Sequence, residues 1–156
     1  MPTREGTLTD SDRRNMRVVM DRLVPPVDDL PGVGSMGLLE DVERMASGHD
    51  RYRRSIARFL DALTMDMSVE AEGGFLALSG EQQDEAIRDI EESLSREFAN
   101  VLEVVYISYY SHPEVHARIG WRTGPLQPVG FTLPPFDESV LDTVRVRKPF
   151  WRQAPE

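Results

Sequence analysis

The chain has 156 residues, of which 40% are hydrophobic and 29% charged, values typical of one globular domain with a buried core. Its formal net charge of −9 argues against a general nucleic-acid binder, which needs a basic face to displace counterions from phosphate. The absence of cysteine excludes disulfides, thiolate nucleophiles, iron–sulfur clusters and covalently attached haem, and no apolar run approaches the ~20 residues that cross a membrane.

The first helix is predicted between Thr9 and Pro25. Thr9 and Asp12 form a capping-box pattern at its start, and the proline pair at 25–26 stops it. Its apolar residues recur at helical spacing: Met16, Val19, Met20 and Leu23. The segment that follows, 28–34, is rich in turn residues and is predicted to be a loop.

Three more helices are predicted before residue 96. The second covers about 38–45, and the third opens near His49. The fourth opens at Ser79, with Gln82 at the reciprocal position of a capping box, after a linker that contains a glycine pair at 73–74. The many carboxylates of the fourth helix are interpreted as a solvated face.

Residues 96–110 differ from the earlier helices because apolar side chains cover nearly every side. One face carries Phe98, Val101, Leu102 and Val105, and Val104, Tyr106, Ile107 and Tyr110 cover much of the rest. A helix that is apolar nearly all round is buried on most sides. We therefore predict a mainly α fold, a compact bundle of about five helices around a buried central helix at 96–110.

The last part of the chain predicts a long irregular tail. Residues 120–135 contain three Gly and four Pro, so they cannot form a regular helix. Residues 140–146 are predicted to form a short strand or a turn. The predicted organisation is a helical domain at 1–119 and a Gly/Pro/aromatic tail at 120–156, which packs on that domain, on a partner subunit, or on both.

The chain carries no complete catalytic or nucleotide-binding motif. There is no Gly-x-Ser-x-Gly turn to present a nucleophile and no phosphate-binding loop. The Gly32-Val33-Gly34 segment does not extend to a dinucleotide fingerprint, because no apolar strand precedes it. We predict no catalytic and no cofactor-binding residues in this chain.

His112 and His116 are the weak candidates for a metal site. Their spacing of four would place both imidazoles on one helix face, as in metalloprotease helices. Glu114 is at the wrong position for that motif, and Pro113 makes His112 a helix start. The favoured interpretation is a surface turn with one histidine near a helix cap, and a metal site is the alternative.

Aromatic residues concentrate at the end of the central helix and in the tail. One interpretation is that they pack the tail onto its own helices; the other is that part of the tail lies on another protein. Trp, Tyr and Arg are the residue types that anchor interfaces, and a tail this long with little periodicity is uncommon unless it serves a function. The predicted interface residues are Tyr109, Tyr110, Trp121, Pro125, Pro128, Phe131, Phe150 and Trp151.

The order of these features resembles the gluconate 2-dehydrogenase subunit 3 family. Each matching segment is short. The most specific part is the last one, which combines the tyrosine pair at 109–110, a turn at Pro113 and the Gly/Pro-rich residues that follow Gly120. The segments run in the family's order from residue 8 to 131: Leu8-Thr9, 21–25, 28–32, 74–79, 82–84, 109–115, Gly120-Trp121 and 128–131.

The resemblance implies a non-catalytic small subunit. In such complexes a large subunit of the glucose–methanol–choline oxidoreductase type carries FAD and oxidises a sugar or alcohol of the glucoside or gluconate kind, and a cytochrome c subunit often takes the electrons. The small subunit is needed for the large one to mature, stay folded or be exported. The implied partner is therefore an FAD-dependent dehydrogenase, with no cofactor in this chain.

Export is less expected here than in the family. Many members carry a twin-arginine export signal, whereas Arg13-Arg14 of this chain falls inside the first predicted helix with no apolar block behind it. We therefore expect a cytoplasmic complex, with a periplasmic one as the alternative if the partner carries the signal. Two other functions stay open: a small helical metal protein or enzyme that uses His112 and His116, and a free-standing adaptor.

Overall fold

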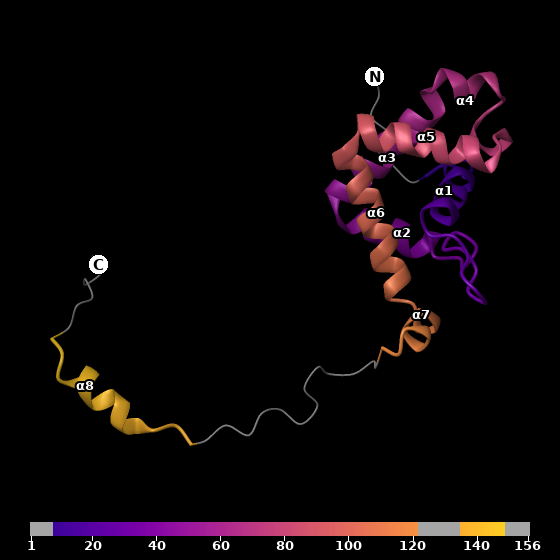
Figure 1. Ribbon diagram of the computed structural model, residues 1–156. Helices are drawn as coiled ribbons and strands as arrows, with labels where there is room; N and C mark the ends of the chain where they lie inside the picture. Colours follow the sequence, from indigo (N-terminus) through magenta and orange to yellow (C-terminus); the bar gives the residue numbers. More distant parts are fainter. Residues whose placement is uncertain (1–7, 122–134, 149–156) are drawn as a thin grey trace. The chain divides into compact units, whose positions relative to one another are not determined.

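The computed structural model describes residues 8–121 and 135–148. The chain divides into two units, Met1–Arg122 and Thr123–Glu156, and each is described by itself. Among the described residues there is no strand, and no helix is long and apolar enough to cross a membrane. The helices of the first unit are α1 (Asp10–Leu23), α2 (Leu39–Gly48), α3 (Asp50–Met65), α4 (Met67–Ala71), η1 (Phe75–Ala77), α5 (Gly80–Ser93), α6 (Ser95–Tyr110) and α7 (Pro113–Arg118) (Figure 1).

Both predicted capping boxes are confirmed. The Thr9 hydroxyl accepts from the Asp12 amide at 3.1 Å, and the Asp12 carboxylate accepts from the Thr9 amide at 3.0 Å. At the start of α5 the Ser79 hydroxyl accepts from the Gln82 amide at 3.3 Å, and the Gln82 side chain accepts from the Ser79 amide at 2.9 Å. Each box satisfies amide donors that a helix start leaves without an intrahelical partner.

The core of this unit lies between α3 and α6, which pack along each other, with α1, α2 and α5 around them. Phe59 of α3 lies against Phe98 of α6, with ring centroids 6.5 Å apart. Most of the side chains with the least solvent exposure come from α1, α3 and α6, and they include Met16, Met20, Ile56, Leu60, Leu63, Val101 and Val104. The predicted mainly α bundle is confirmed.

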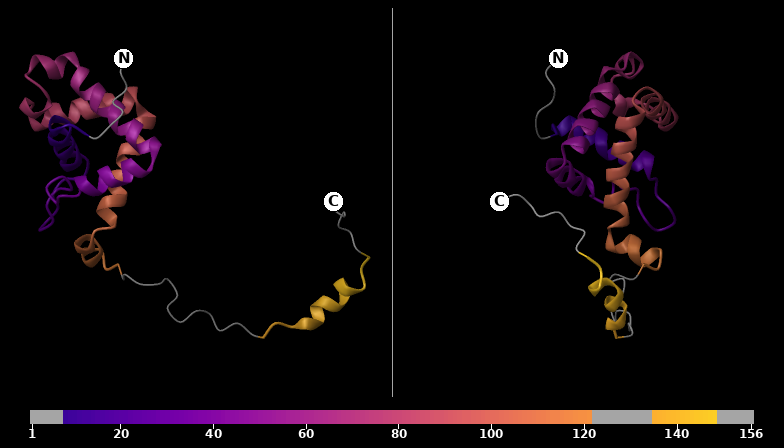
Figure 2. Two further views of the ribbon diagram at one scale, coloured as in Figure 1. Left: turned by 180° about the vertical axis from the view of Figure 1, so that it is seen from behind. Right: turned by 90° about the vertical axis from the view of Figure 1, so that its left-hand side faces the viewer.

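Helix α6 runs the length of this unit, and α7 lies at its C-terminal end (Figure 2). The α6 side chains that face the core are Phe98, Val101, Val104, Val105 and Ser108. On the outer side, Tyr106, Ile107 and Tyr110 are exposed. The expectation of burial on most sides therefore fails for the last turns of α6, which carry an apolar stripe that this unit does not cover.

The predicted linker before α5 contains structure that the periodicity did not indicate. Helix α4 and the turn η1 both lie there, and Asp66 caps α4 by accepting from the amides of Ser68 at 2.8 Å and Val69 at 3.3 Å. The hydrogen bond from the Ser68 hydroxyl, followed by the one from its amide, lowers the pKa of Asp66. Val69 and Phe75 are buried, so this short segment closes one end of the core.

The second unit contains the turn η2 (Glu138–Leu141) followed directly by α8 (Asp142–Arg145). The prediction of a strand or turn at 140–146 is wrong for residues 140–145, which are helical, whereas Val146 lies in a turn. The Asp137 carboxylate accepts from the Ser139 amide at 3.0 Å and opens the helical run. None of the residues in η2 and α8 is buried.

Candidate functional site

The last turns of α6, helix α7 and the residue Trp121 after it bring together a cluster of rings, which we call the aromatic ridge: Tyr106, Tyr109, Tyr110, His116 and Trp121. The rings of Tyr106 and Tyr110 meet edge to face at 6.0 Å, and those of Tyr109 and Tyr110 do so at 5.1 Å. His116 and Trp121 lie 6.4 Å apart in a tilted arrangement. Such pairs hold aromatic side chains in defined orientations.

His116 joins the two halves of the ridge. Its Nε2 atom contacts the carbonyl oxygen of Tyr110, and because a carbonyl only accepts, Nε2 carries the proton in this contact. The amide of Trp121 donates in turn to the carbonyl of His116 at 2.8 Å. The backbone of Trp121 is therefore linked to the end of α6 through one histidine.

Three of the five ridge residues, Tyr106, Tyr110 and Trp121, are exposed, whereas Tyr109 and His116 are half-buried. Tyr110 and Trp121 keep 52% and 58% of their surface accessible, and Ile107 and Ile119 beside them are also exposed. Single exposed hydrophobic residues are normal on a protein surface, whereas a contiguous set marks an interaction site. Tyr and Trp are also the residue types enriched among the residues that dominate binding energy.

Ion pairs hold α7, and with it the ridge, in place. The Arg118 guanidinium donates to the carboxylates of both Asp28 and Asp29, in the loop between α1 and α2. The hydrogen bond to Asp28 and the charge of Asp29 raise the pKa of Arg118. Pro113 starts α7 at a position where its missing amide costs no helical bond, and Gly120, with φ of 68°, lets the chain turn away after it.

The α1–α2 loop (residues 24–38) is itself fixed to α1. The Asp21 carboxylate accepts from the Ser35 amide at 3.0 Å and from its hydroxyl at 2.8 Å. Val33 is fully buried, and Gly32 and Gly34 on either side of it lie too close to α1 for a side chain. A continuous set of contacts therefore runs from α1 through this loop to Arg118 and the ridge.

A cleft of about 300 Å³ lies beside the ridge, between α2, the end of α6 and the start of α7. Met45 and Ile107 give it apolar walls, and Ser111 and His112 contribute polar ones. The Nδ1 atom of His112 is buried and has no hydrogen-bond partner. The cleft shares Ile107 with the exposed stripe of α6, which also carries Tyr106 and Tyr110.

The two candidate metal ligands lie in different settings. His112 caps the start of α7, whereas the Nε2 of His116 is engaged by the Tyr110 carbonyl. Within residues 8–121 and 135–148, no three His, Asp or Glu side chains are grouped so that they could hold a metal ion. The geometry brings no metal-binding set together around either histidine.

Three of the eight predicted interface residues can be placed. Tyr110 and Trp121 are exposed on the ridge, and Tyr109 is partly buried against the core. The other five lie outside the described residues: Pro125, Pro128, Phe131, Phe150 and Trp151. The predicted interface set did not include Tyr106, Ile107 and Ile119, which are exposed. The sequence separates Tyr106 and Ile107 from the face that holds Phe98 and Val101, but their apolar character favoured burial.

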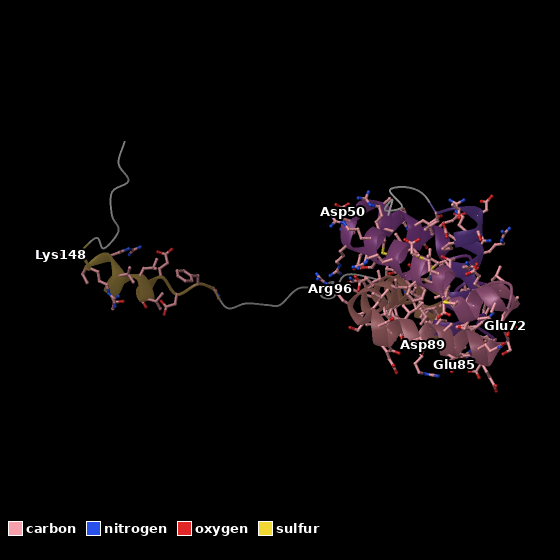
Figure 3. The ribbon with its side chains drawn as sticks, turned by 90° about the horizontal axis from the view of Figure 1, so that it is seen from above. Asp50, Glu72, Glu85, Asp89, Arg96 and Lys148 are labelled. Carbon is pink, nitrogen blue, oxygen red and sulfur yellow. The ribbon has the colours of Figure 1, made fainter. Side chains whose placement is uncertain are left out.

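Most charged side chains of the first unit lie outside the aromatic ridge. Residues 8–121 contain 22 acidic side chains and 12 arginines. Figure 3 shows Glu85 and Asp89 of α5 and Glu72 on the outside of the helices, where they are exposed to solvent. Arg22 pairs with Asp84 and Arg58 with Glu97, in contacts between helices. The carboxylates of α5 therefore lie largely on a solvated face, as the sequence indicated.

The sequence matches the model of one known protein family. The family model described as gluconate 2-dehydrogenase subunit 3 matches residues 10–125, a range that includes α1 to α7 and every residue of the ridge. No curated protein and no solved structure gave a match. Since the matched range covers well over half of the chain, the protein belongs to the gluconate 2-dehydrogenase subunit 3 family.

Proposed function

We propose that this chain is a non-catalytic small subunit that binds the FAD-containing catalytic subunit of a sugar or alcohol dehydrogenase and stabilises its flavin-loaded fold. The family supplies the first support, because its description is that of a dehydrogenase subunit. The observation that carries the proposal is the exposed aromatic ridge. A fixed surface of Tyr and Trp side chains suits protein docking, because these residue types dominate the binding energy of many interfaces.

The ridge would act by burying its apolar side chains against the larger subunit. Tyr110 and Trp121 enter apolar pockets of the larger subunit, while the cleft at Met45 and Ile107 receives a side chain from it. Any species that binds the folded state and not the unfolded one stabilises the folded state by mass action. The flavin and the reacting groups then belong to the partner, and a cytochrome c subunit would accept the electrons.

Co-expression tests the proposal directly. An FAD-dependent dehydrogenase subunit of the same organism is produced with and without this chain, and the yield and the FAD content per polypeptide are measured. We expect both to fall clearly when the chain is left out. Equal yield and equal FAD content in the two preparations would refute the proposal.

A pair of variants tests whether the ridge is the docking surface. Tyr110→Ala combined with Trp121→Ala should abolish co-purification, because these side chains are exposed and their loss leaves the core intact. Met67→Ala is the matched control, since Met67 is 84% exposed and lies in α4, away from the ridge residues of α6 and α7 in the chain. Loss of the complex in the control as well would mean that the ridge is not the docking surface.

A further inference from the structure

Asp28 has a backbone conformation that the described part of the chain otherwise reserves for glycine. Its φ is 54°, and within residues 8–121 and 135–148 it is the only residue other than glycine with a positive φ. The other positive φ angles in these ranges belong to Gly37, Gly73, Gly74 and Gly120. In this left-handed region the Cβ atom of an L residue lies close to a backbone carbonyl oxygen, which is unfavourable. Asp28 therefore carries strain that a glycine would not.

The strained residue lies in a tight turn between α1 and α2. Val27 and Leu30 each donate an amide hydrogen bond to the other's carbonyl, both at 3.0 Å, so Asp28 and Asp29 are the central residues of the turn. Only the first of the two has a positive φ, which is the pattern of a hairpin turn that prefers glycine at that position. The geometry of the turn therefore favours glycine at position 28, not aspartate.

The Asp28 carboxylate acts outside its own turn. The side chain is 71% exposed, so it does not fill the core. Aspartate visits the left-handed region most readily when its carboxylate bonds to nearby backbone. Within the described residues, however, this carboxylate accepts from the Arg118 guanidinium and from no backbone amide. Asp29 contacts the same guanidinium from a backbone without a positive φ. The contact with Arg118 is therefore what the strained residue supplies.

Helix α7 depends on such contacts because it is short. It has six residues, of which Val115 is buried, and a helix of this length is marginal in water without tertiary contacts. Its middle is joined to α6 by the contact of His116 with the Tyr110 carbonyl. Arg118 is its last residue and lies three positions before Trp121. The two aspartates therefore fix the end of α7 from which the chain continues to the ridge.

We propose that Asp28 is a positioning residue, whose carboxylate holds the end of α7 and so sets the orientation in which Trp121 meets the partner subunit. The part of this inference that concerns the partner rests on the proposed function; the part that concerns α7 does not. Strained conformations persist where the surrounding structure fixes them, and they cluster at sites that serve binding or catalysis. A glycine at position 28 would relax the turn but loosen α7, so its effects on stability and on binding should differ.

The variants Asp28→Gly and Asp28→Ala separate these two effects in the full chain. Both remove the carboxylate, so hydrogen exchange should quicken about threefold at the amides of Ile119 and Trp121, which donate to the carbonyls of Val115 and His116. Only the glycine relieves the strain. It should therefore melt within ~2 °C of the native chain, whereas the alanine variant should melt about 3 °C below the glycine variant.

Binding is measured with the dehydrogenase subunit of the co-expression experiment by biolayer interferometry. Both Asp28 variants should bind about threefold more weakly, because a loosened α7 must be ordered when the complex forms. Arg54→Ala is the matched control, since it breaks an exposed ion pair within α3. Its affinity and its exchange at α7 should both stay at the native values.

Three results would overturn the inference. Native exchange at α7 in Asp28→Gly would show that the carboxylate does not hold this helix. A glycine variant that melts no higher than the alanine variant would show that position 28 is not strained. Faster exchange with native affinity would show that the partner does not depend on the orientation of α7, and the proposed function would stand. If the native chain forms no complex, the proposed function fails and the binding role of Asp28 fails with it, while exchange and melting still decide whether Asp28 holds α7.

Discussion

The carbonyl oxygen of Arg17 occupies the space that a side chain on Gly34 would need. A Cβ atom at position 34 would lie 1.9 Å from that oxygen, far inside van der Waals contact. Because Arg17 contributes backbone, a rotamer change cannot relieve the clash. The glycine is therefore required by the close approach of the α1–α2 loop to α1, a packing reason that does not involve a nucleotide.

Gly34→Ala should consequently destabilise the chain by about 2 kcal/mol or more, since the loop must move away from α1 and expose Val33. Gly48→Ala is the control: Gly48 ends α2 with open space around it, and the change should be neutral or slightly stabilising. Urea unfolding followed by circular dichroism measures both. Equal stability of the two variants would show that the loop does not need this close approach.

A substitution in the core between α3 and α6 should lower the stability of the chain by a larger amount. Phe59→Ala removes a fully buried ring that packs against Phe98, and should cost about 3–5 kcal/mol. Met67→Ala removes a side chain that is almost entirely in solvent and should change the stability by no more than about 0.5 kcal/mol. Denaturant midpoints compare the two. A small cost for Phe59→Ala would contradict the packing described for this core.

The ion pair between Arg22 and Asp84 makes part of the stability depend on pH. The hydrogen bond from Arg22, aided by its charge, lowers the pKa of Asp84, so the folded state favours the carboxylate. The stabilisation is therefore complete above the unfolded pKa of about 3.9 and is lost as the pH falls through the lower pKa of the folded state. Both side chains are more than a third exposed, at 35% and 41%, so the contribution is modest.

Asp84→Asn should thus lower stability at pH 7 by less than about 1 kcal/mol, and the difference from the native chain should shrink as the pH falls below about 4. Asp89→Asn, an exposed carboxylate of the same helix, is the control and should show no such convergence. Melting curves recorded between pH 7 and pH 3 distinguish them. A difference in stability between Asp84→Asn and the native chain that grows toward low pH would contradict this prediction.

Arg118→Ala tests the attachment of α7. We expect little change in the melting temperature, because the guanidinium and both of its carboxylate partners lie on the surface. Affinity for the dehydrogenase subunit should fall, because α7 is released from the α1–α2 loop and the ridge loses its fixed orientation. Arg54→Ala, which breaks an exposed pair within α3, should leave affinity unchanged. Equal affinities of the two variants would show that the ion pairs do not position the ridge.

Local sequence patterns predicted most of the helices because their causes are local. Thr9 and Ser79 stand at helix starts with their reciprocal partners three residues on, and the structure forms both boxes. Helix α4 escaped prediction since it is five residues long and depends on the Asp66 cap and on the burial of Val69. The helical form of 140–145 was not predicted: the valines of this segment are of a type that favours strands, whereas the Asp137 cap favours a helix.

Only part of the candidate site could be predicted from the sequence. Tyr110 and Trp121 could be named as interface residues because their types and positions were suggestive. Apolar composition alone could not show that Tyr106 and Ile107 face outward, since that depends on which side of α6 meets α3. The contact of Arg118 with Asp28 joins residues 90 positions apart, and no local pattern indicates it.

That long separation has a consequence for synthesis. The α1–α2 loop is made early, but its two aspartates meet their arginine only after α7 has been translated. The ridge is therefore among the last surfaces of the first unit to form, and it requires both ends of that unit to be in place. On the proposed function, a partner that binds the ridge would therefore bind only chains in which α7 has already been made.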